Sequence, residues 1–185
     1  MRPAPRTTAS GVSGVLAISL AACTRTPAPP TDPVALAAHW QDLAAEYEEL
    51  VRGYDEATGA RQISVDELRS RVARGAPIVL LDIREEHENR VSALPGALHV
   101  APADVASAPI AAPAESLVVT YCTAGYRSGL AAVALEERLG REVVNLHGGI
   151  VAWFNAGGEV RDPNGNPVDR IDAYGPAWEK FVRPR

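Results

Sequence analysis

The chain has 185 residues, of which 46% are hydrophobic and 22% are charged, the balance of a globular protein rather than a disordered or fibrous one. Its formal net charge of -5 lacks the excess of positive charge that sequence-independent nucleic-acid binding needs, so no nucleic-acid partner is expected. Two cysteines are too few for a disulfide framework or a cysteine-rich zinc site, and no apolar run reaches the roughly 18 residues of a membrane-spanning helix.

The N-terminus has the pattern of an export signal. A short basic segment, residues 1–6, precedes the small and apolar residues 11–22, which are too few to span a membrane as a helix. The run ends in Leu20-Ala21-Ala22-Cys23, which resembles a bacterial lipobox. The resemblance implies that residues 1–22 are a signal peptide and that Cys23 becomes the lipidated first residue of the mature chain. The alternative is a plain secretory signal in which Cys23 is incidental.

A lipid on Cys23 would anchor the protein to a membrane of the cell envelope, facing the periplasm or the exterior. Thr24, with no aspartate after the cysteine, favours the outer membrane under the sorting rule of some Gram-negative bacteria. Residues 23–33 are rich in proline and predict an extended tether between the lipid and the folded part of the chain.

Residues 34–61 predict an N-terminal helical extension. From Val34 to Asp55, apolar residues recur at intervals of three and four and form one stripe, which indicates a helix that packs on the main domain. Ser64 and Glu67 have the spacing of a capping box and predict the start of a second helix, which ends at Gly75.

Residues 62–158 alternate short apolar strands with helices, which predicts an α/β domain with a central parallel sheet flanked by helices. The expected strands are Ile78–Ile83, Ala97–Val100, Leu117–Tyr121 and Glu142–Leu146. The expected helices after them are Ser128–Leu139, with Leu130, Val133, Ala134 and Leu139 facing inward, and Gly149–Asn155. Residues 101–116 have no clear assignment. Residues 159–185 form a polar tail whose Trp178 and Phe181 are expected to pack back on the domain.

The most informative segment is Cys122–Ser128, where a buried strand ends in a cysteine and a glycine-containing loop leads into a helix. Such a loop turns backbone N–H groups inward, and with the helix dipole behind them it favours an anion at its centre. Cys122 is therefore expected to be a nucleophile. Gly125 lets the backbone turn, and Arg127 adds a fixed positive charge that can hold an oxyanion. The alternative is an inert buried cysteine.

From about Ile63 to Ala156 the chain resembles the rhodanese-like family of single-domain sulfurtransferases. The resemblance rests on four segments that follow one another in the family order: Leu80-Leu81-Asp82-Ile83-Arg84 with Glu88 after it, Leu94-Pro95-Gly96-Ala97, the loop Cys122–Ser128, and Leu146-His147-Gly148-Gly149-Ile150 with Trp153. The last residues, Tyr174-Gly175-Pro176-Ala177-Trp178, are similar to a tail found in one branch of exported members.

The resemblance implies a rhodanese-like fold and a reaction in which Cys122 takes a sulfane sulfur from a donor such as thiosulfate and passes it to a thiophilic acceptor such as a thiol or cyanide. It implies that Asp82, Arg84 and Glu88 support the site, although a solvated charged turn is the alternative for these three. The sequence has no metal-ligand spacing, phosphate-binding glycine loop or dinucleotide fingerprint, so no cofactor or metal is expected. The residues expected to bind the substrate are Thr123, Ala124, Gly125, Tyr126, Arg127 and Ser128. With Cys23 lipidated, Cys122 is the only thiol, so the sulfur has to leave to an external acceptor.

Two other functions remain open. A phosphatase or arsenate reductase is disfavoured because only four residues separate Cys122 from Arg127, one fewer than in the related phosphatases. A binding or sensing module that carries sulfur without turnover is the second alternative. His147 is interpreted as a structural residue rather than a base for Cys122, since no third residue is seen to orient it. The sequence gives no oligomeric state.

Overall fold

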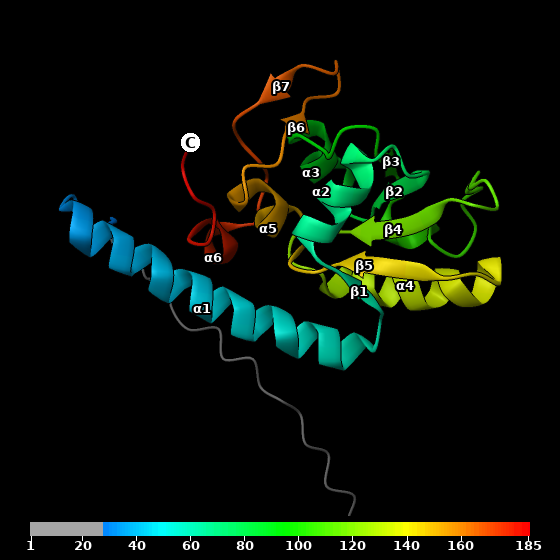
Figure 1. Cartoon of the computed structure of the whole chain (residues 1–185), viewed down its shortest axis with the longest axis horizontal. Coiled ribbons are helices and arrows are strands. Elements are labelled where there is room, and N and C mark those ends of the chain that lie inside the picture. Colours follow the sequence, from blue (N-terminus) through cyan, green and yellow to red (C-terminus); the bar gives the residue numbers. More distant parts are fainter. Residues whose placement is uncertain (1–27) are drawn as a thin grey trace, which may run out of the picture.

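The computed structural model describes residues 28–185, so the expected signal peptide and Cys23 lie outside the described residues. Its centre is a parallel five-stranded sheet with strand order β1-β5-β4-β2-β3 (Figure 1). The strands are β1 (Gln62–Ile63), β2 (Ile78–Asp82), β3 (Leu98–His99), β4 (Leu117–Tyr121) and β5 (Val143–Leu146). Helices cover both faces, which confirms the predicted α/β fold.

The alternation of side chains along the strands divides the interior between the two faces of the sheet. Val119 and Tyr121 of β4 point to the face that carries α2 (Val65–Ala73) and α5 (Gly149–Asn155). Val118 points to the opposite face and packs with α4 (Tyr126–Leu139). Because both faces are covered, the inner strands β2, β4 and β5 are mostly apolar, as expected for buried parallel strands.

The prediction for the inward face of α4 was wrong for Leu130, Val133 and Ala134, whereas Leu139 does pack against the interior. Leu130 and Val133 are nearly half exposed, and Ala134 is exposed as well. The buried positions are instead the small residues Ser128, Gly129, Ala131 and Ala132, together with Leu135. The reason is that α4 lies between the sheet and a second helix, α1, and close approach on both sides requires small side chains.

Helix α1 (Pro33–Thr58) is longer than predicted and lies beside α4 (Figure 1). The Asp32 carboxylate accepts hydrogen bonds from two backbone N–H groups at its start, and Gly59 ends it in the left-handed conformation. At the contact with α4, a Cβ on Gly129 would lie 2.6 Å from the Thr58 Oγ1. A glycine at this point is therefore what lets the two helices touch.

The C-terminal tail packs on α1 and α5 and encloses a third apolar cluster. In this cluster Tyr47 and Val51 of α1 contact Val151 of α5 and Phe181 of the tail, and all four are buried. The tail contains a hairpin, β6 (Val160–Arg161) and β7 (Pro167–Val168), and the short helix α6 (Pro176–Glu179).

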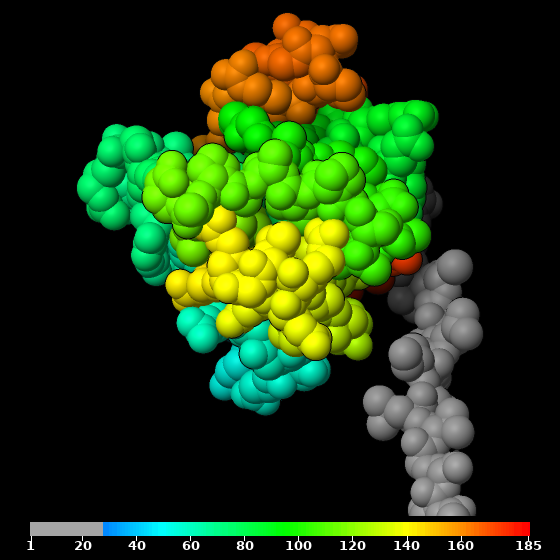
Figure 2. All heavy atoms as spheres, turned by 90° about the vertical axis from the view of Figure 1, so that its right-hand side faces the viewer, coloured from blue at the N-terminus to red at the C-terminus, as the bar shows by residue number. Residues whose placement is uncertain are grey.

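Figure 2 views the molecule from the side where the strands begin, with the β6–β7 hairpin as the orange protrusion at the top.

The remaining elements are α3 (Glu86–Val91) and a 3-10 turn (Pro102–Asp104) in the segment that the sequence left unassigned. At the start of α2 the Ser64 Oγ accepts the Glu67 N–H, but the Glu67 carboxylate pairs with Arg71, so only half of the predicted capping box forms. Within residues 28–185, no helix is both long and apolar enough to cross a membrane.

Candidate active site

Cys122 follows β4, the central strand, so its Sγ lies at the carboxyl edge of the sheet between two flanking strands. The cysteine is 2% exposed. Gly125 has a φ of +106°, a conformation that a side chain strongly disfavours, and its N–H points to the Cys122 Sγ at 3.2 Å. Helix α4 begins at Tyr126, two residues earlier than predicted, so the loop from Cys122 to Gly125 feeds directly into the helix N-terminus. The arrangement places a sulfur in a cradle suited to negative charge.

Neighbouring elements hold the loop in place through its carbonyl groups. The Ile150 N–H donates to the Cys122 carbonyl at 2.8 Å, and a Cβ on Gly149 would collide with that same carbonyl oxygen. Asn145 Nδ2 donates to the Gly125 carbonyl at 3.1 Å, while its Oδ1 accepts the Ser128 hydroxyl at 2.6 Å. Ser128 therefore supports the loop from beneath rather than contacting a substrate, because its side chain is fully buried.

Asn145 was not among the residues predicted for the site. It is fully buried and bridges β5 to the loop after β4. The signal in the sequence was an asparagine within the apolar strand segment of residues 142–146, since a buried amide has to find hydrogen-bond partners.

Glu88 and Arg127 form a buried ion pair at the edge of the loop. The Arg127 guanidinium donates to both Glu88 carboxylate oxygens, at 2.6 and 2.8 Å, and the Thr123 hydroxyl donates to the same carboxylate at 2.8 Å. Burial by itself would raise the pKa of Glu88, but the hydrogen bonds from Arg127, the Glu85 N–H and Thr123 lower it below the ordinary value. Arg127 is thus oriented by Glu88, and its side chain remains 24% exposed toward the pocket.

Asp82 and Arg84 form a second buried pair. Arg84 donates to both Asp82 carboxylate oxygens, at 2.8 and 2.6 Å, and to the Ser92 carbonyl at 2.6 Å. Both side chains are fully buried, which excludes the solvated charged turn that the sequence left open. Burial by itself would lower the pKa of Arg84, but the hydrogen bonds to Asp82 outweigh it and raise the pKa, so the guanidinium stays charged. This pair fixes the chain between β2 and α3, which carries Glu88.

Four aromatic residues surround the opening above Cys122. The pocket has a volume of about 240 Å³ and is lined by Cys122, Thr123 and Ala124 of the loop, by Tyr126 and Arg127 of α4, by Tyr54 of α1, and by Tyr174 and Trp178 of the tail. The loop residues were expected at the site from the sequence, but Tyr54 and Tyr174 were not, and Trp178 was expected only as a packing residue. No local pattern relates these positions to Cys122, because folding alone brings the two ends of the chain to the loop.

His147 contacts α1 rather than the cysteine. Its Nδ1 lies 2.6 Å from an Asp55 carboxylate oxygen, and its Nε2 lies 3.1 Å from Glu48. Burial by itself would lower the pKa of His147, but the hydrogen bonds to Glu48 and Asp55 raise it above the usual value. The interpretation of His147 as a structural residue agrees with this geometry.

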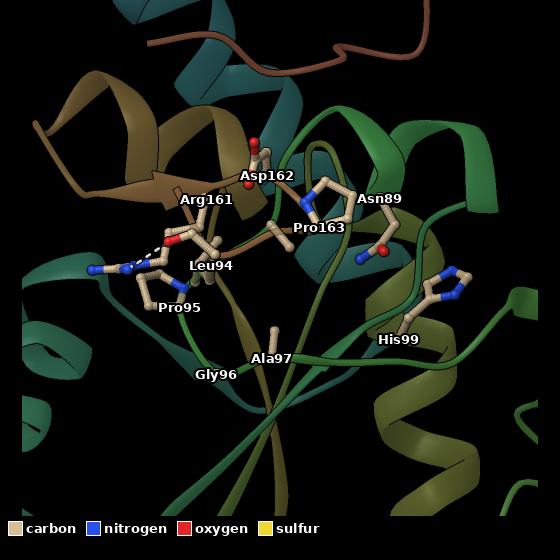
Figure 3. Close-up of a pocket in the computed structure, with 11 residues that line it drawn as sticks. Asn89, Leu94, Pro95, Gly96, Ala97, His99, Arg161, Asp162 and Pro163 are labelled. Atoms are coloured by element: carbon tan, nitrogen blue, oxygen red, sulfur yellow. Dashed lines mark hydrogen bonds between the residues drawn. The ribbon is translucent and has the colours of Figure 1, made fainter. Parts of the chain in front are cut away.

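Another cavity, of about 340 Å³, lies between the β6–β7 hairpin and the Leu94–Ala97 turn (Figure 3). Its Arg161 side chain donates to the Gly165 carbonyl at 2.7 Å, and no cysteine lines it. Residues 28–185 contain no group of three or more metal-binding side chains placed to hold an ion.

Comparisons with known proteins agree with this fold. A sulfurtransferase of Allochromatium vinosum is 32% identical over 108 residues, which cover 56% of this chain and 97% of that protein. A tRNA uridine(34) hydroxylase of Xanthomonas axonopodis pv. citri is 36% identical over 116 residues, which cover 59% of this chain but only 47% of the hydroxylase.

The crystal structure of a thiosulfate sulfurtransferase from Pseudomonas aeruginosa superposes with a TM-score of 0.52 at 21% identity. The superposed region covers 73% of this chain and 26% of the Pseudomonas protein. At this identity the likeness shows the fold alone. The family model of the rhodanese-like domain matches residues 64–156, about half of the chain and the whole of the cradle around Cys122. The chain belongs to the rhodanese-like domain family.

Proposed function

We propose that the protein is a sulfurtransferase that carries a sulfane sulfur as a persulfide on Cys122. The observation that carries the proposal is the loop geometry: the Gly125 N–H points at the Cys122 Sγ, and α4 begins directly behind it. This cradle stabilises negative charge on the thiolate and on the terminal sulfur of the persulfide. Relatives that are named sulfurtransferases support the same activity.

With thiosulfate as donor, the Cys122 thiolate attacks the sulfane sulfur with its electron pair. A new S–S bond forms, the original S–S bond breaks, and its electron pair leaves with sulfite. A thiol or cyanide acceptor then attacks the terminal sulfur and restores the thiolate. Neither step needs a proton from the protein, which fits a site where His147 is held by α1 and where Glu88 is paired with Arg127.

The test uses soluble protein that starts at Thr24, so that Cys122 is its only cysteine. After incubation with thiosulfate, intact mass spectrometry is expected to show a gain of one sulfur atom, which is lost again on addition of cyanide. Cys122→Ser is the control and should gain nothing. If neither thiosulfate nor a polysulfide adds sulfur to the parent protein, the proposed activity is wrong. Loading without release would favour the sulfur-carrying or sensing module instead.

We also propose that Cys23 carries a lipid that anchors the enzyme in the cell envelope, with the outer membrane favoured. The support is the lipobox-like sequence before Cys23. Expression of the full chain in a bacterium with a labelled fatty acid is expected to label the protein, and Cys23→Ala is expected to remove the label. Equal labelling of both proteins would contradict the anchor.

A further inference from the structure

The pocket above Cys122 has walls that come from outside the family match. That match covers residues 64–156, whereas Tyr54 belongs to α1 and both Tyr174 and Trp178 belong to the tail. The Tyr54 ring lies 5.2 Å from the Tyr126 ring and 6.1 Å from the Trp178 ring, measured between centroids. The Tyr174 ring lies against the Arg127 guanidinium, 4.6 Å from its Cζ. Four aromatic side chains thus frame one opening.

The aromatic walls are held in position by contacts below them. The Tyr47 hydroxyl donates to the Gly148 carbonyl at 2.7 Å, and its ring packs on Phe181 at 5.1 Å. Phe181 in turn contacts Trp178, with 6.2 Å between centroids. The two segments that supply Tyr54 and Trp178 are therefore fixed on the domain through buried residues.

The lining is more apolar than an inorganic donor requires. Thiosulfate is a small, strongly hydrated anion with no apolar surface to bury, and a cavity of about 240 Å³ has room for several water molecules at about 30 Å³ each. At the same time the floor favours an anion, because Arg127 is partly exposed there and α4 begins there. The pocket thus fits a small molecule with a negatively charged sulfur end and a flat apolar body.

We propose that this pocket selects organic sulfane-sulfur donors whose departing part carries an aromatic or other flat apolar group. The sulfane sulfur lies on Cys122 and the apolar group lies between the aromatic walls. This inference rests on the proposed sulfurtransferase activity and names its substrate class.

The transfer from such a donor balances in the same way as with thiosulfate. For an aryl thiosulfonate, the thiolate attacks the terminal sulfur, the S–S bond breaks, and the electron pair leaves on the aryl sulfinate. For an organic persulfide, the pair leaves on the organic thiolate. No oxidant or reductant is consumed.

The experiment measures the rate at which Cys122 gains sulfur from benzenethiosulfonate, methanethiosulfonate and thiosulfate, by intact mass. The protein is the full chain with Cys23→Ser, which leaves one thiol. For each variant, the loading rate with benzenethiosulfonate is divided by the loading rate with methanethiosulfonate. This donor ratio is informative because the intrinsic reactivity of the two donors cancels when variants are compared. Trp178→Ala and Tyr174→Ala are each expected to lower this ratio about three- to tenfold, the worth of one aromatic contact.

Trp40→Ala is the matched control. Trp40 also lies on α1 and contacts the tail through Arg183, but it lines a separate groove away from Cys122. The donor ratio of Trp40→Ala is expected to equal that of the parent. Tyr174 is 57% exposed, so its removal tests the pocket even if loss of Trp178 loosens the tail. Thiosulfate loading should stay within about twofold in Trp40→Ala, since Trp40 lies outside the pocket above Cys122.

The inference about organic donors and the proposed sulfurtransferase activity would fail with different results. If the donor ratio is the same in the parent, Tyr174→Ala and Trp178→Ala while all three donors load Cys122, the inference about the organic donor is overturned and the sulfurtransferase activity stands. If none of the donors loads the parent protein, the proposed activity fails and the inference fails with it.

Discussion

Glu88→Gln tests whether the buried pair with Arg127 keeps the catalytic loop in shape. In the parent, the fully buried Glu88 carboxylate accepts two hydrogen bonds from Arg127, one from the Thr123 hydroxyl and one from the Glu85 N–H. Glutamine has nearly the same size, so the substitution removes charge without creating a cavity. In the glutamine, an NH₂ group replaces one of the two carboxylate oxygens. This group cannot accept a hydrogen bond, and it faces the Arg127 guanidinium.

The cost follows from the hydrogen bonds that the substitution removes. At least one charge-assisted hydrogen bond disappears and the others weaken, at about 1.5–3 kcal/mol for a bond to a charged group. Breaking a fully buried pair costs about 3–5 kcal/mol. Because the Arg127 side chain is 24% exposed and water can reach part of it, we expect a loss of about 2–3 kcal/mol in the free energy of unfolding at neutral pH.

The pH dependence provides the sharper test. The folded-state pKa of Glu88 lies below its ordinary value, so the pair contributes stability that is fully present above the unfolded-state pKa of about 4.3. That contribution is lost as the pH falls through the lower folded-state pKa. The glutamine has no such proton to bind. The difference in stability between parent and variant should therefore be largest near neutral pH and shrink in acid.

The assay is urea unfolding of both proteins, followed by circular dichroism, at about pH 7 and at several values down to about pH 3. Sulfur loading of Cys122 is measured at neutral pH and should slow in the variant, because Thr123 and Arg127 lose their common anchor. A stability difference that stays constant from neutral pH into acid, or a variant as stable as the parent, would refute the reasoning.

Two further predictions concern the docking of α1 on the domain. Gly129→Ala is expected to destabilise the fold by about 1–3 kcal/mol, despite the better helix propensity of alanine, because the new Cβ would lie 2.6 Å from the Thr58 Oγ1. Adding Thr58→Ala should recover part of the loss in thermal denaturation, and a stabilised Gly129→Ala would contradict the close contact. The pKa of His147 is raised, so its ion pairs with Glu48 and Asp55 contribute stability below the ordinary histidine pKa of about 6.5, and this is lost as the pH rises through the folded-state value. The melting temperature of the parent should fall more between about pH 6 and pH 9 than that of His147→Gln; parallel curves would argue against the pairs.

Local patterns in the sequence were sufficient to predict the elements whose formation depends on residues only a few positions apart. The strand Leu117–Tyr121 was predicted correctly because a continuous apolar run between turn signals needs burial on both faces. The helix Gly149–Asn155 matched as well, and the turn at Gly125 followed from a glycine in a short loop. Ser64 was correctly identified as a helix N-cap, since its side chain bonds a backbone N–H only three residues away.

The predictions failed where a residue depends on a distant partner. Leu130 and Val133 satisfy a helical stripe, yet they face solvent because α1 packs against α4 through Gly129. The pairing of Glu88 with Arg127 joins residues 39 positions apart, and the hydrogen bond of Tyr47 to Gly148 spans 101 positions. Spacing along the chain carries no information about such contacts.

Hydrophobic periodicity and turn chemistry act over a few residues, so the order of strands and helices and the cysteine at a strand end can be read from the amino-acid sequence. The shape of the pocket cannot, since Tyr54, Tyr126 and Trp178 meet through packing of both chain ends on the domain. The main partner of Arg127 could not be predicted from the sequence either. Arg127 was expected to bind the substrate, but in the folded chain its guanidinium donates hydrogen bonds to both Glu88 carboxylate oxygens. An ion pair forms where burial brings opposite charges together, and burial is a property of the whole fold.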